Sequence, residues 1–229
     1  MRDAGMRLER LLWRSDGSRR LPSRRALDEA LAALPRGALW RLCEGNPHAP
    51  LYLLPTRDWI AALARECRAL GRRVLEVGAG DGFVAARLAE ADPSLKVVAT
   101  DSGAWERACA RMTATEARSA LGRRARGVRL GPKVLRLDAV AAVRRFRPDV
   151  VLAIWLPPGR LLTRLLRAPC RWVVEVGVAG GITAGGVLDR RHPHAPLVGP
   201  IERLARCRLD QRPAVELHSR ITLYRGGRP

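Results

Sequence analysis

The residues best suited to hold a ligand lie between positions 74 and 91. Glycines stand at alternate positions, Gly78, Gly80 and Gly82, after a short apolar run at 74–77 and before an amphipathic segment at 83–91. The apolar run predicts a buried strand, and the amphipathic segment predicts a helix. Because glycine has no Cβ, its backbone can approach a ligand closely, and its bare amides can bind a carboxylate. The pattern therefore predicts a ligand-binding turn between a strand and a helix.

Carboxylates recur at the ends of the predicted strands. Glu76 lies within the first strand, Asp101 follows a strand at 96–100, and Asp138 follows a strand at 134–137. In open α/β sheets, ligands bind beyond the carboxyl ends of the strands, so these side chains are expected to face one site. A carboxylate there can accept hydrogen bonds from a diol or an amine. The alternative for Asp138 is a structural one, as the N-cap of the helix that follows.

The spacing of these residues distinguishes between nucleotide-binding families. A dinucleotide-binding turn has the pattern G-x-G-x-x-G, which requires glycine where this chain has Phe83. The acidic-x-Gly-x-Gly-x-Gly order of residues 76–82 instead resembles motif I of the class I S-adenosylmethionine (SAM)-dependent methyltransferases. With the strands that end in Asp101 and Asp138, this resemblance covers residues 73–225.

The resemblance implies SAM as the cofactor and gives roles to the turn and to the strand ends. In such an arrangement Glu76 and the glycines hold the methionine end of SAM, Asp101 holds the ribose, and Asp138 contacts the adenine. The cofactor-binding residues implied in this way are Glu76, Gly78, Ala79, Gly80, Asp81, Gly82, Asp101, Ser102, Asp138, Ala139 and Trp155.

The resemblance and the hydrophobic pattern together predict an α/β fold. We expect a seven-stranded, mostly parallel sheet with helices on both faces and an antiparallel last strand. The strands are expected at 74–77, 96–100, 134–137, 150–154, 171–176, 206–210 and 219–224. The helices are expected at 24–34, 38–44, 57–70, 83–91, 104–121, 160–167 and 201–205, with Ser23 and Thr56 as N-caps of the first and third.

The first 55 residues show no strand pattern and are expected to form an N-terminal helical extension. We therefore divide the chain into residues 1–55 and a SAM-binding methyltransferase domain at 56–229. In the family that the chain resembles, a helix before the first strand often covers the SAM pocket, which implies a lid. A stabilising appendage explains the same pattern, and the sequence leaves both interpretations open.

The segment after the fourth predicted strand, Trp155-Leu156-Pro157-Pro158-Gly159, is expected to face the methyl acceptor. Family members that methylate exocyclic amines of nucleobases typically have Asn, Asp or Ser before the two prolines and an aromatic residue after them. Leu156 and Gly159 occupy those positions here, which disfavours adenine-N6 chemistry. Trp155 is a candidate for stacking on the acceptor or for a cation–π contact with the sulfonium, and its alternative is a core residue at a strand end.

Few residues are candidates for a general base. His192 and His194, in the loop expected after the fifth strand, are the histidines placed to act near neutral pH, and a solvated loop is the alternative. Together with Trp155 they are the candidate catalytic residues. Cys170 precedes the fifth strand, at the opposite edge of the sheet, so we interpret it as structural. The histidines and cysteines show no metal-ligand spacing, so no metal is expected.

The formal net charge is +20, and only Lys96 and Lys133 among the basic residues are lysines. A GC-rich genome accounts for arginine in place of lysine but not for the shortage of acidic residues. An electropositive surface therefore remains, and nucleic acid is a candidate partner. The densest basic run, residues 122–129, is suited to bind phosphates, but we interpret it as a solvated loop at the edge opposite to the SAM site.

These observations predict a SAM-dependent methyltransferase whose acceptor is a small molecule. The alternatives are an RNA or DNA methyltransferase and a catalytically inert SAM-fold protein that acts as a binding or scaffold partner. No apolar run approaches the ~20 residues that a membrane span requires, and residues 1–25 lack the apolar centre of a signal peptide. The scattered cysteines are typical of reduced thiols. We therefore expect a cytoplasmic protein without membrane association.

Overall fold

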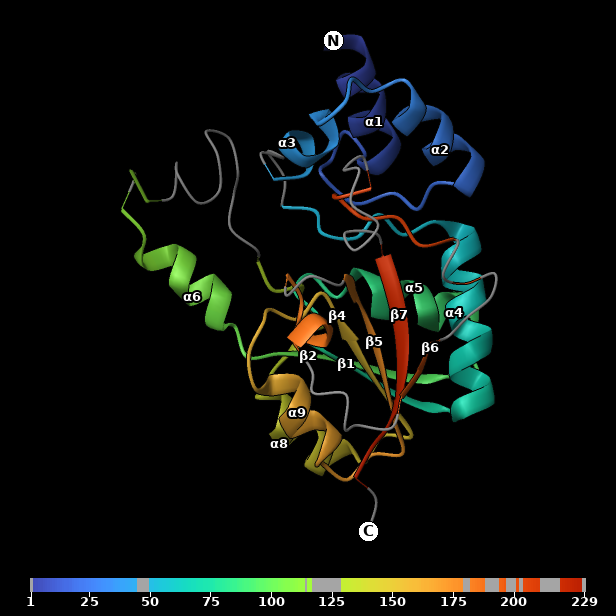
Figure 1. Cartoon of the computed structure of the whole chain (residues 1–229), viewed down its shortest axis with the longest axis vertical. Helices are drawn as coiled ribbons and strands as arrows, with labels where there is room; N and C mark the ends of the chain where they lie inside the picture. The colour runs from blue at the N-terminus through green and yellow to red at the C-terminus, as the bar shows by residue number, and fades with distance from the viewer. Residues whose placement is uncertain are drawn as a thin grey trace.

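The strands of the chain assemble into one mostly parallel sheet that carries helices on both faces (Figure 1). The structure is a computed structural model, and it describes residues 2–44, 50–113, 115–116, 129–178, 182–187, 194–196, 201, 204–210 and 219–227. The strands are β1 (Arg73–Val77), β2 (Lys96–Asp101), β3 (Leu135–Arg136), β4 (Val150–Ile154), β5 (Trp172–Val178), β6 (His194–Pro196) and β7 (Ser219–Arg225). They lie in the order β3-β2-β1-β4-β5-β7-β6, with β7 antiparallel to both of its neighbours. The predicted mostly parallel α/β arrangement is confirmed.

The central strands are buried on both faces because apolar side chains occupy successive positions. In β4, Val150 and Leu152 contribute to one core, and Val151 and Ala153 contribute to the other. This alternation follows from the two-residue period of a strand, and an uninterrupted apolar run is what burial on both faces requires. In the buried part of β1, Glu76 is the polar exception.

Two layers of helices cover the sheet (Figure 1). Helices α4 (Arg57–Leu70) and α5 (Phe83–Ala91) pack on one face, and α8 (Ala139–Phe146) and α9 (Leu161–Leu166) pack on the other. The bounds of α4 and α5 match the predicted helices, and Thr56 caps α4 as predicted. Among the helices that the structure describes, none is both long and apolar enough to cross a membrane.

The N-terminal residues form a helical subdomain, at the top of Figure 1, with its own apolar core. It contains α1 (Arg2–Leu12), α2 (Arg24–Ala32) and α3 (Ala38–Glu44). Ser23 caps α2 as predicted, because its hydroxyl accepts a hydrogen bond from the N–H of Ala26 at 3.2 Å. The buried members of this core are Leu8, Leu12, Trp13, Leu27, Ala30, Leu34, Leu39, Cys43, Leu51 and Leu54.

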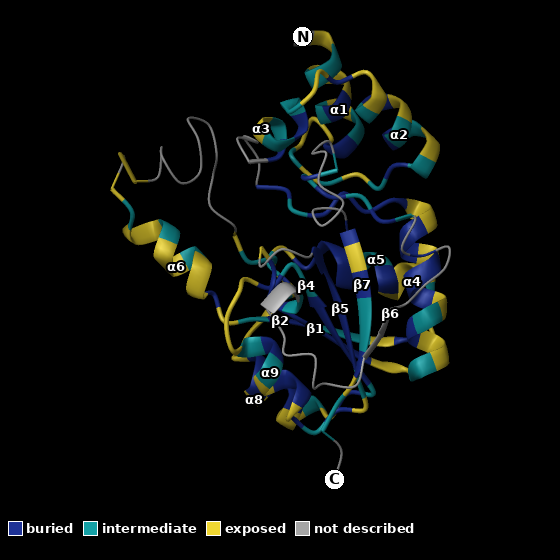
Figure 2. Cartoon of the chain, viewed as in Figure 1, coloured by how far each residue is buried: buried dark blue, intermediate teal, exposed yellow. Residues whose placement is uncertain are grey.

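Two predicted elements are wrong. Residues 206–210 form no strand, because Cys207 makes only an isolated bridge with Leu53 and residues 208–210 form a turn. The strand beside β7 is β6 instead. The helix predicted at 104–121 is interrupted, since α6 (Ala104–Arg111) ends before Met112, and residues 117–121 lie outside the described residues. Helix α6 buries no residue and extends away from the sheet (Figures 1 and 2).

Candidate functional site

A large cavity lies at the carboxyl ends of β1 and β4, where the order of the strands reverses. Strand β1 pairs with β2 on one side and with β4 on the other, which makes this edge the switch point of the sheet. The cavity has a volume of about 880 Å³, and small-molecule sites typically measure ~300–1,000 Å³. Its walls come from the N-terminal subdomain, from the loops after β1, β2 and β4, and from α6.

The glycine turn, residues 78–82, forms one wall of this cavity. Gly78 and Gly80 have φ angles of +64° and +56°, in the left-handed region that residues with a Cβ rarely adopt. A Cβ on Gly78 would in addition lie 2.9 Å from Cδ2 of Leu156. The carbonyl of Gly80 accepts a hydrogen bond from the N–H of Gly131 at 3.2 Å, which fixes the turn from outside. The sequence therefore exposes bare backbone to the cavity.

Asp101, the last residue of β2, joins the glycine turn to the next loop. One carboxylate oxygen accepts a hydrogen bond from the N–H of Gly80 at 3.0 Å, and the other accepts one from the N–H of Gly103 at 2.7 Å. Asp101 also lines the cavity, beside Ser102. Since a carboxylate has about four lone-pair positions, Asp101 can hold the turn and accept hydrogen bonds from a ligand at the same time.

Glu76 is a buried carboxyl group in the cavity wall, only 3% exposed. One of its oxygens accepts a hydrogen bond from the N–H of Ala85 in α5 at 2.8 Å. Burial raises the pKa of Glu76 to about 8, and the hydrogen bond from Ala85 opposes this change. Asp81 and Asp101 raise the pKa further, whereas Arg19 lowers it. At neutral pH, Glu76 is therefore held protonated and will ionise beside a cationic ligand.

Three residues expected to bind the cofactor, Gly82, Asp138 and Ala139, do not line the cavity. Asp138 is the N-cap of α8, and its carboxylate accepts hydrogen bonds from the N–H groups of Val140 and Ala141 at 3.0 and 3.1 Å. It lines a second cavity of about 320 Å³. This geometry is that of the structural alternative for Asp138. The expected residues that do line the large cavity are Glu76, Gly78, Ala79, Gly80, Asp81, Asp101, Ser102 and Trp155.

Trp155 follows β4 and has a strained backbone, with a φ angle of +52°. Its N–H donates a hydrogen bond to the carbonyl of Val176 at 2.7 Å, which holds this conformation. The Trp155 ring lies against Tyr52, with ring centroids 5.7 Å apart and an interplanar angle of 36°. The guanidinium carbon of Arg208 lies 4.5 Å from the Tyr52 centroid and 5.5 Å from that of Trp155. We call Tyr52, Trp155 and Arg208 the aromatic wall of the cavity.

The described part of the chain brings no histidine to the cavity. Strand β6 carries His194, whose backbone is in register with Tyr224. Tyr224 is in register with Val173 near the start of β5, so His194 lies toward the end of the strands that is opposite to the cavity. The expectation that His194 acts as a base at the site is therefore corrected. His192 lies outside the described residues.

Cys170 has the surroundings of a structural residue. It is 2% exposed, and its thiol lies 3.7 Å from the carbonyl oxygen of Leu165. Burial raises the pKa of the Cys170 thiol to about 11, and such a thiol is a poor nucleophile at neutral pH. These surroundings agree with the interpretation made from the sequence.

The basic run at 122–129 reaches the site at its last residue. Arg129 and Leu130 line the cavity, and the N–H of Leu130 donates a hydrogen bond to the carboxylate of Glu106 at 3.3 Å. For Arg129, the expected position at the opposite edge is wrong. Residues 122–128 lie outside the described residues.

The N-terminal subdomain contributes cavity residues that no sequence motif marks. Arg19 and Tyr52 are the clearest cases, and both line the cavity. Nη1 of Arg19 lies 3.1 Å from Oδ2 of Asp81 in the glycine turn. Because these partners are 62 positions apart in the chain, no local pattern could have revealed the contact.

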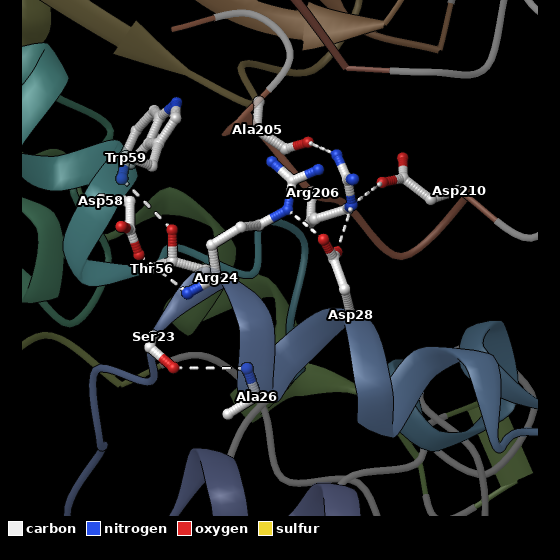
Figure 3. A network of polar contacts seen from close by, with 10 residues as sticks. All are labelled: Ser23, Arg24, Ala26, Asp28, Thr56, Asp58, Trp59, Ala205, Arg206 and Asp210. Carbon is white, nitrogen blue, oxygen red and sulfur yellow. Dashed lines mark hydrogen bonds and ion pairs between the residues drawn. The ribbon is translucent and has the colours of Figure 1, made fainter. Parts of the chain in front are cut away.

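A polar network holds the N-terminal subdomain against the rest of the chain (Figure 3). Asp28 of α2 forms ion pairs with Arg24 and, at 3.0 Å, with Arg206. Two residues further on, the N–H of Arg208 donates a hydrogen bond to the carbonyl of Tyr52 at 3.1 Å. The same pairing of segments therefore sets Tyr52 beside Arg208 and assembles the aromatic wall.

No protein-family model and no curated protein sequence matches the chain. Among solved structures, the chain is similar to the N-terminal domain of EvdMO1 with SAH bound, at 16% identity over 73% of this chain and 81% of that chain, with a TM-score of 0.38. It is similar to the 23S rRNA methyltransferase ErmE, at 19% identity over 78% and 71% of the two chains, with a TM-score of 0.40. It is also similar to the methyltransferase domain of bacterial CtHen1, at 12% identity over 75% and 98%, with a TM-score of 0.39.

Proposed function

We propose that the protein is a SAM-dependent methyltransferase of the class I type that acts on a small-molecule acceptor. One observation carries this proposal: the glycine turn and Asp101 meet at a single cavity beyond the carboxyl ends of β1 and β2. The turn supplies backbone that a ligand can approach closely, and Asp101 supplies an acceptor for a ribose diol. The order of the motifs in the sequence supports the same cofactor.

The residues present fit SAM. Gly78 lies in the cavity wall with a left-handed backbone, and a Cβ there would press on Leu156, which also lines the cavity. Glu76 and Asp81 offer carboxyl groups to the ammonium of the methionine part, and Asp101 offers one to the ribose. Trp155 offers an aromatic face to a sulfonium. When bound, SAM supplies an electrophilic methyl group on that sulfonium and becomes S-adenosylhomocysteine (SAH) after transfer.

The chain itself contributes positioning and the exclusion of water. Methyl transfer is an in-line displacement, so the acceptor atom must lie on the side of the methyl group opposite to the sulfur. Leu156, Pro157 and Tyr52 line the cavity and keep water from the reacting atoms. A general base is required only where the acceptor atom carries a proton of high pKa.

The cover over the cavity favours a small acceptor. The N-terminal subdomain covers the cavity with three residues that are not exposed, Leu51, Tyr52 and Leu53. A volume of about 880 Å³ has to hold the cofactor and the acceptor together. A compact molecule suits this space.

Calorimetric titration with SAM and, separately, with SAH tests the proposal. We expect both to bind in the micromolar range, and labelled SAM should then transfer its methyl group to a member of a small-molecule panel. Absence of binding of either compound, by protein that circular dichroism shows to be folded, would contradict the methyltransferase function. That result would favour the inert binding or scaffold alternative.

One observation favours nucleic acid as a second candidate for the acceptor. The cavity is lined by Trp105, which is 43% exposed on α6, and by Arg129 at the end of the basic run. An exposed aromatic residue near an arginine is suited to stack a base and to contact a phosphate. Retention on a polyanion that weakens steeply with salt, together with methyl transfer to tRNA or rRNA, would favour this candidate.

Asp101→Ala is expected to weaken SAM binding by roughly 1–3 kcal/mol, because buried ribose hydroxyls lose their acceptor. The glycine turn also loses its hydrogen bond from the N–H of Gly80 to this carboxylate. 5′-Methylthioadenosine (MTA) contains the same ribose without the amino-acid part, so its affinity should fall by the same amount. Calorimetry with both ligands measures the two losses.

Asp138→Ala is the matched control for Asp101→Ala. It removes the N-cap of α8 and should cost about 1 kcal/mol of stability in urea unfolding, with SAM affinity unchanged. Weaker SAM binding by folded Asp138→Ala protein would restore the adenine role. Unchanged affinities in folded Asp101→Ala protein would exclude the ribose role.

A further inference from the structure

Arg19 is an arginine of the N-terminal subdomain that reaches the glycine turn. It lies in a tight hairpin between α1 and α2, where Trp13 forms a bridge with Arg19 and the N–H of Arg14 donates a hydrogen bond to the carbonyl of Ser18 at 2.8 Å. The hairpin fixes the backbone of Arg19, and its side chain forms part of the cavity wall. That side chain is only 17% exposed, so its charge requires a partner.

Two contacts hold the Arg19 guanidinium beside the turn. Nη1 lies 3.1 Å from Oδ2 and 3.5 Å from Oδ1 of Asp81. The guanidinium carbon lies 4.0 Å from the centroid of the Phe83 ring, a cation–π distance. The two hydrogen bonds from Arg19 to the Asp81 carboxylate both come from Nη1. Within the described part of the chain, Nη2 and Nε of Arg19 therefore keep their donors for a ligand in the cavity.

The charges around the turn are unequal in sign. Among the residues that the structure describes, Glu76, Asp81 and Asp101 place carboxyl groups there, and Arg19 forms an ion pair with Asp81 of the turn. An ammonium group suits these carboxyl groups, but a carboxylate anion would be repelled unless a cation received it. The methionine part of SAM carries both groups, so a cation at this place would favour binding of its carboxylate.

We propose that Arg19 binds the α-carboxylate of SAM through the guanidinium nitrogens that Asp81 does not use. This inference rests on the proposed function, because it takes SAM as the ligand. A planar guanidinium can hold a carboxylate by two parallel hydrogen bonds, which an ammonium cannot do. The N-terminal subdomain is then part of the cofactor site, and bound SAM connects the hairpin of Arg19 to the glycine turn.

Calorimetry with SAM, SAH and MTA tests this assignment, since only MTA lacks the carboxylate. Arg19→Met should weaken the binding of SAM and SAH roughly ten- to hundredfold and leave the affinity for MTA unchanged. Arg19→Lys keeps the charge without the paired geometry, so its loss should be intermediate. Arg20→Met alters an exposed neighbour that does not line the cavity, and it should leave all three affinities unchanged.

The Arg19→Met/Asp81→Asn double variant is compared with Asp81→Asn alone, because Asp81 is itself placed beside the ammonium of SAM. If Arg19 only neutralises Asp81, the double variant binds SAM as tightly as Asp81→Asn does. The inference expects the double variant to bind SAM roughly ten- to hundredfold more weakly than Asp81→Asn. Equal SAM affinities of these two variants, equal losses for SAM and MTA in Arg19→Met, or unchanged SAM affinity in that variant would each overturn it. Thermal unfolding of each variant verifies the fold, and wild-type protein that binds neither SAM nor SAH would overturn the proposed function itself.

Discussion

Gly80→Val is expected to abolish SAM binding in calorimetry, with a loss of at least roughly a hundredfold, about 2.8 kcal/mol. Gly80 lines the cavity with a φ angle of +56°, and its N–H donates a hydrogen bond to Asp101. A valine would place a branched side chain where the cofactor backbone contact is proposed, and it would strain a left-handed conformation by ~1–2 kcal/mol. Relaxation of that strain would rotate the Gly80 N–H away from Asp101. The steric and the conformational effects both act against binding.

Gly37→Val separates conformational strain from the effect on the cavity. Gly37 has a similar φ angle of +73°, but nothing lies within 4 Å of a Cβ placed there, and it does not line the cavity. The two valine variants should lose similar amounts of stability in urea unfolding, whereas only Gly80→Val should lose SAM binding. Wild-type SAM affinity in folded Gly80→Val protein would contradict the assignment of the turn.

The part of the site that the sequence predicts is the part built from neighbouring residues. The strand, the glycine turn and α5 follow one another directly, so periodicity and turn chemistry locate them, and Asp101 follows at the end of the next strand. The side chain of Asp138 illustrates where this reasoning leaves two outcomes open. A carboxylate after a strand can face a ligand or cap the next helix, and the same residue type serves both purposes.

The residues that the sequence does not predict depend on contacts between distant segments. Residues 206–210 alternate as a strand would, with Cys207 and Leu209 buried. They alternate because they lie between the N-terminal subdomain and the sheet, where they pack against Val178 and Trp40 rather than join a ladder. The aromatic wall depends on this placement of Arg208. Helix α1 did leave a local signal, since Leu8, Leu11 and Leu12 have helical spacing, but the charged residues between them obscure it.

Glu76→Gln is expected to raise the free energy of unfolding above pH 7 and to leave it unchanged below pH 5. Burial raises the pKa of Glu76 to about 8, from an ordinary value of 4.5. A carboxyl group whose pKa is raised by folding stabilises the fold fully below about pH 4.5, and this contribution is lost as the pH rises toward 8. At 1.36 kcal/mol per pH unit, wild-type protein loses roughly 4–5 kcal/mol over this range. Glutamine does not titrate, and its amide oxygen can still accept the hydrogen bond from Ala85. Urea unfolding at intervals between pH 5 and pH 8 measures the difference.

Glu175→Gln is the matched control for Glu76→Gln. Glu175 is also 3% exposed, and burial raises its pKa to about 7, but it does not line the cavity. Relative to wild-type protein, Glu175→Gln should also become more stable as the pH rises, and this gain should reach its full size near pH 7. Its SAM affinity should equal that of wild-type protein. If Glu76→Gln and wild-type protein show the same dependence of stability on pH, the raised pKa of Glu76 is excluded.

Glu76 should also couple stability to cofactor binding. An ammonium group beside the carboxyl group favours its ionised form, so SAM binding should lower the pKa of Glu76 and release a proton below pH 8. Wild-type SAM affinity should therefore rise between about pH 6 and pH 8, and calorimetry in two buffers of different ionisation enthalpy should detect the proton.

Glu76→Gln should show neither the rise in SAM affinity nor the release of a proton. MTA has no ammonium, so its binding should show neither change in either protein. Asp81, Asp101 and Arg19 are the same in both proteins, so the difference belongs to Glu76. If Glu76 is only structural, Glu76→Gln should be more stable than wild-type protein and bind SAM equally well. If Glu76→Gln is more stable but binds SAM more weakly, the buried carboxyl group contributes to ligand binding at a cost in stability.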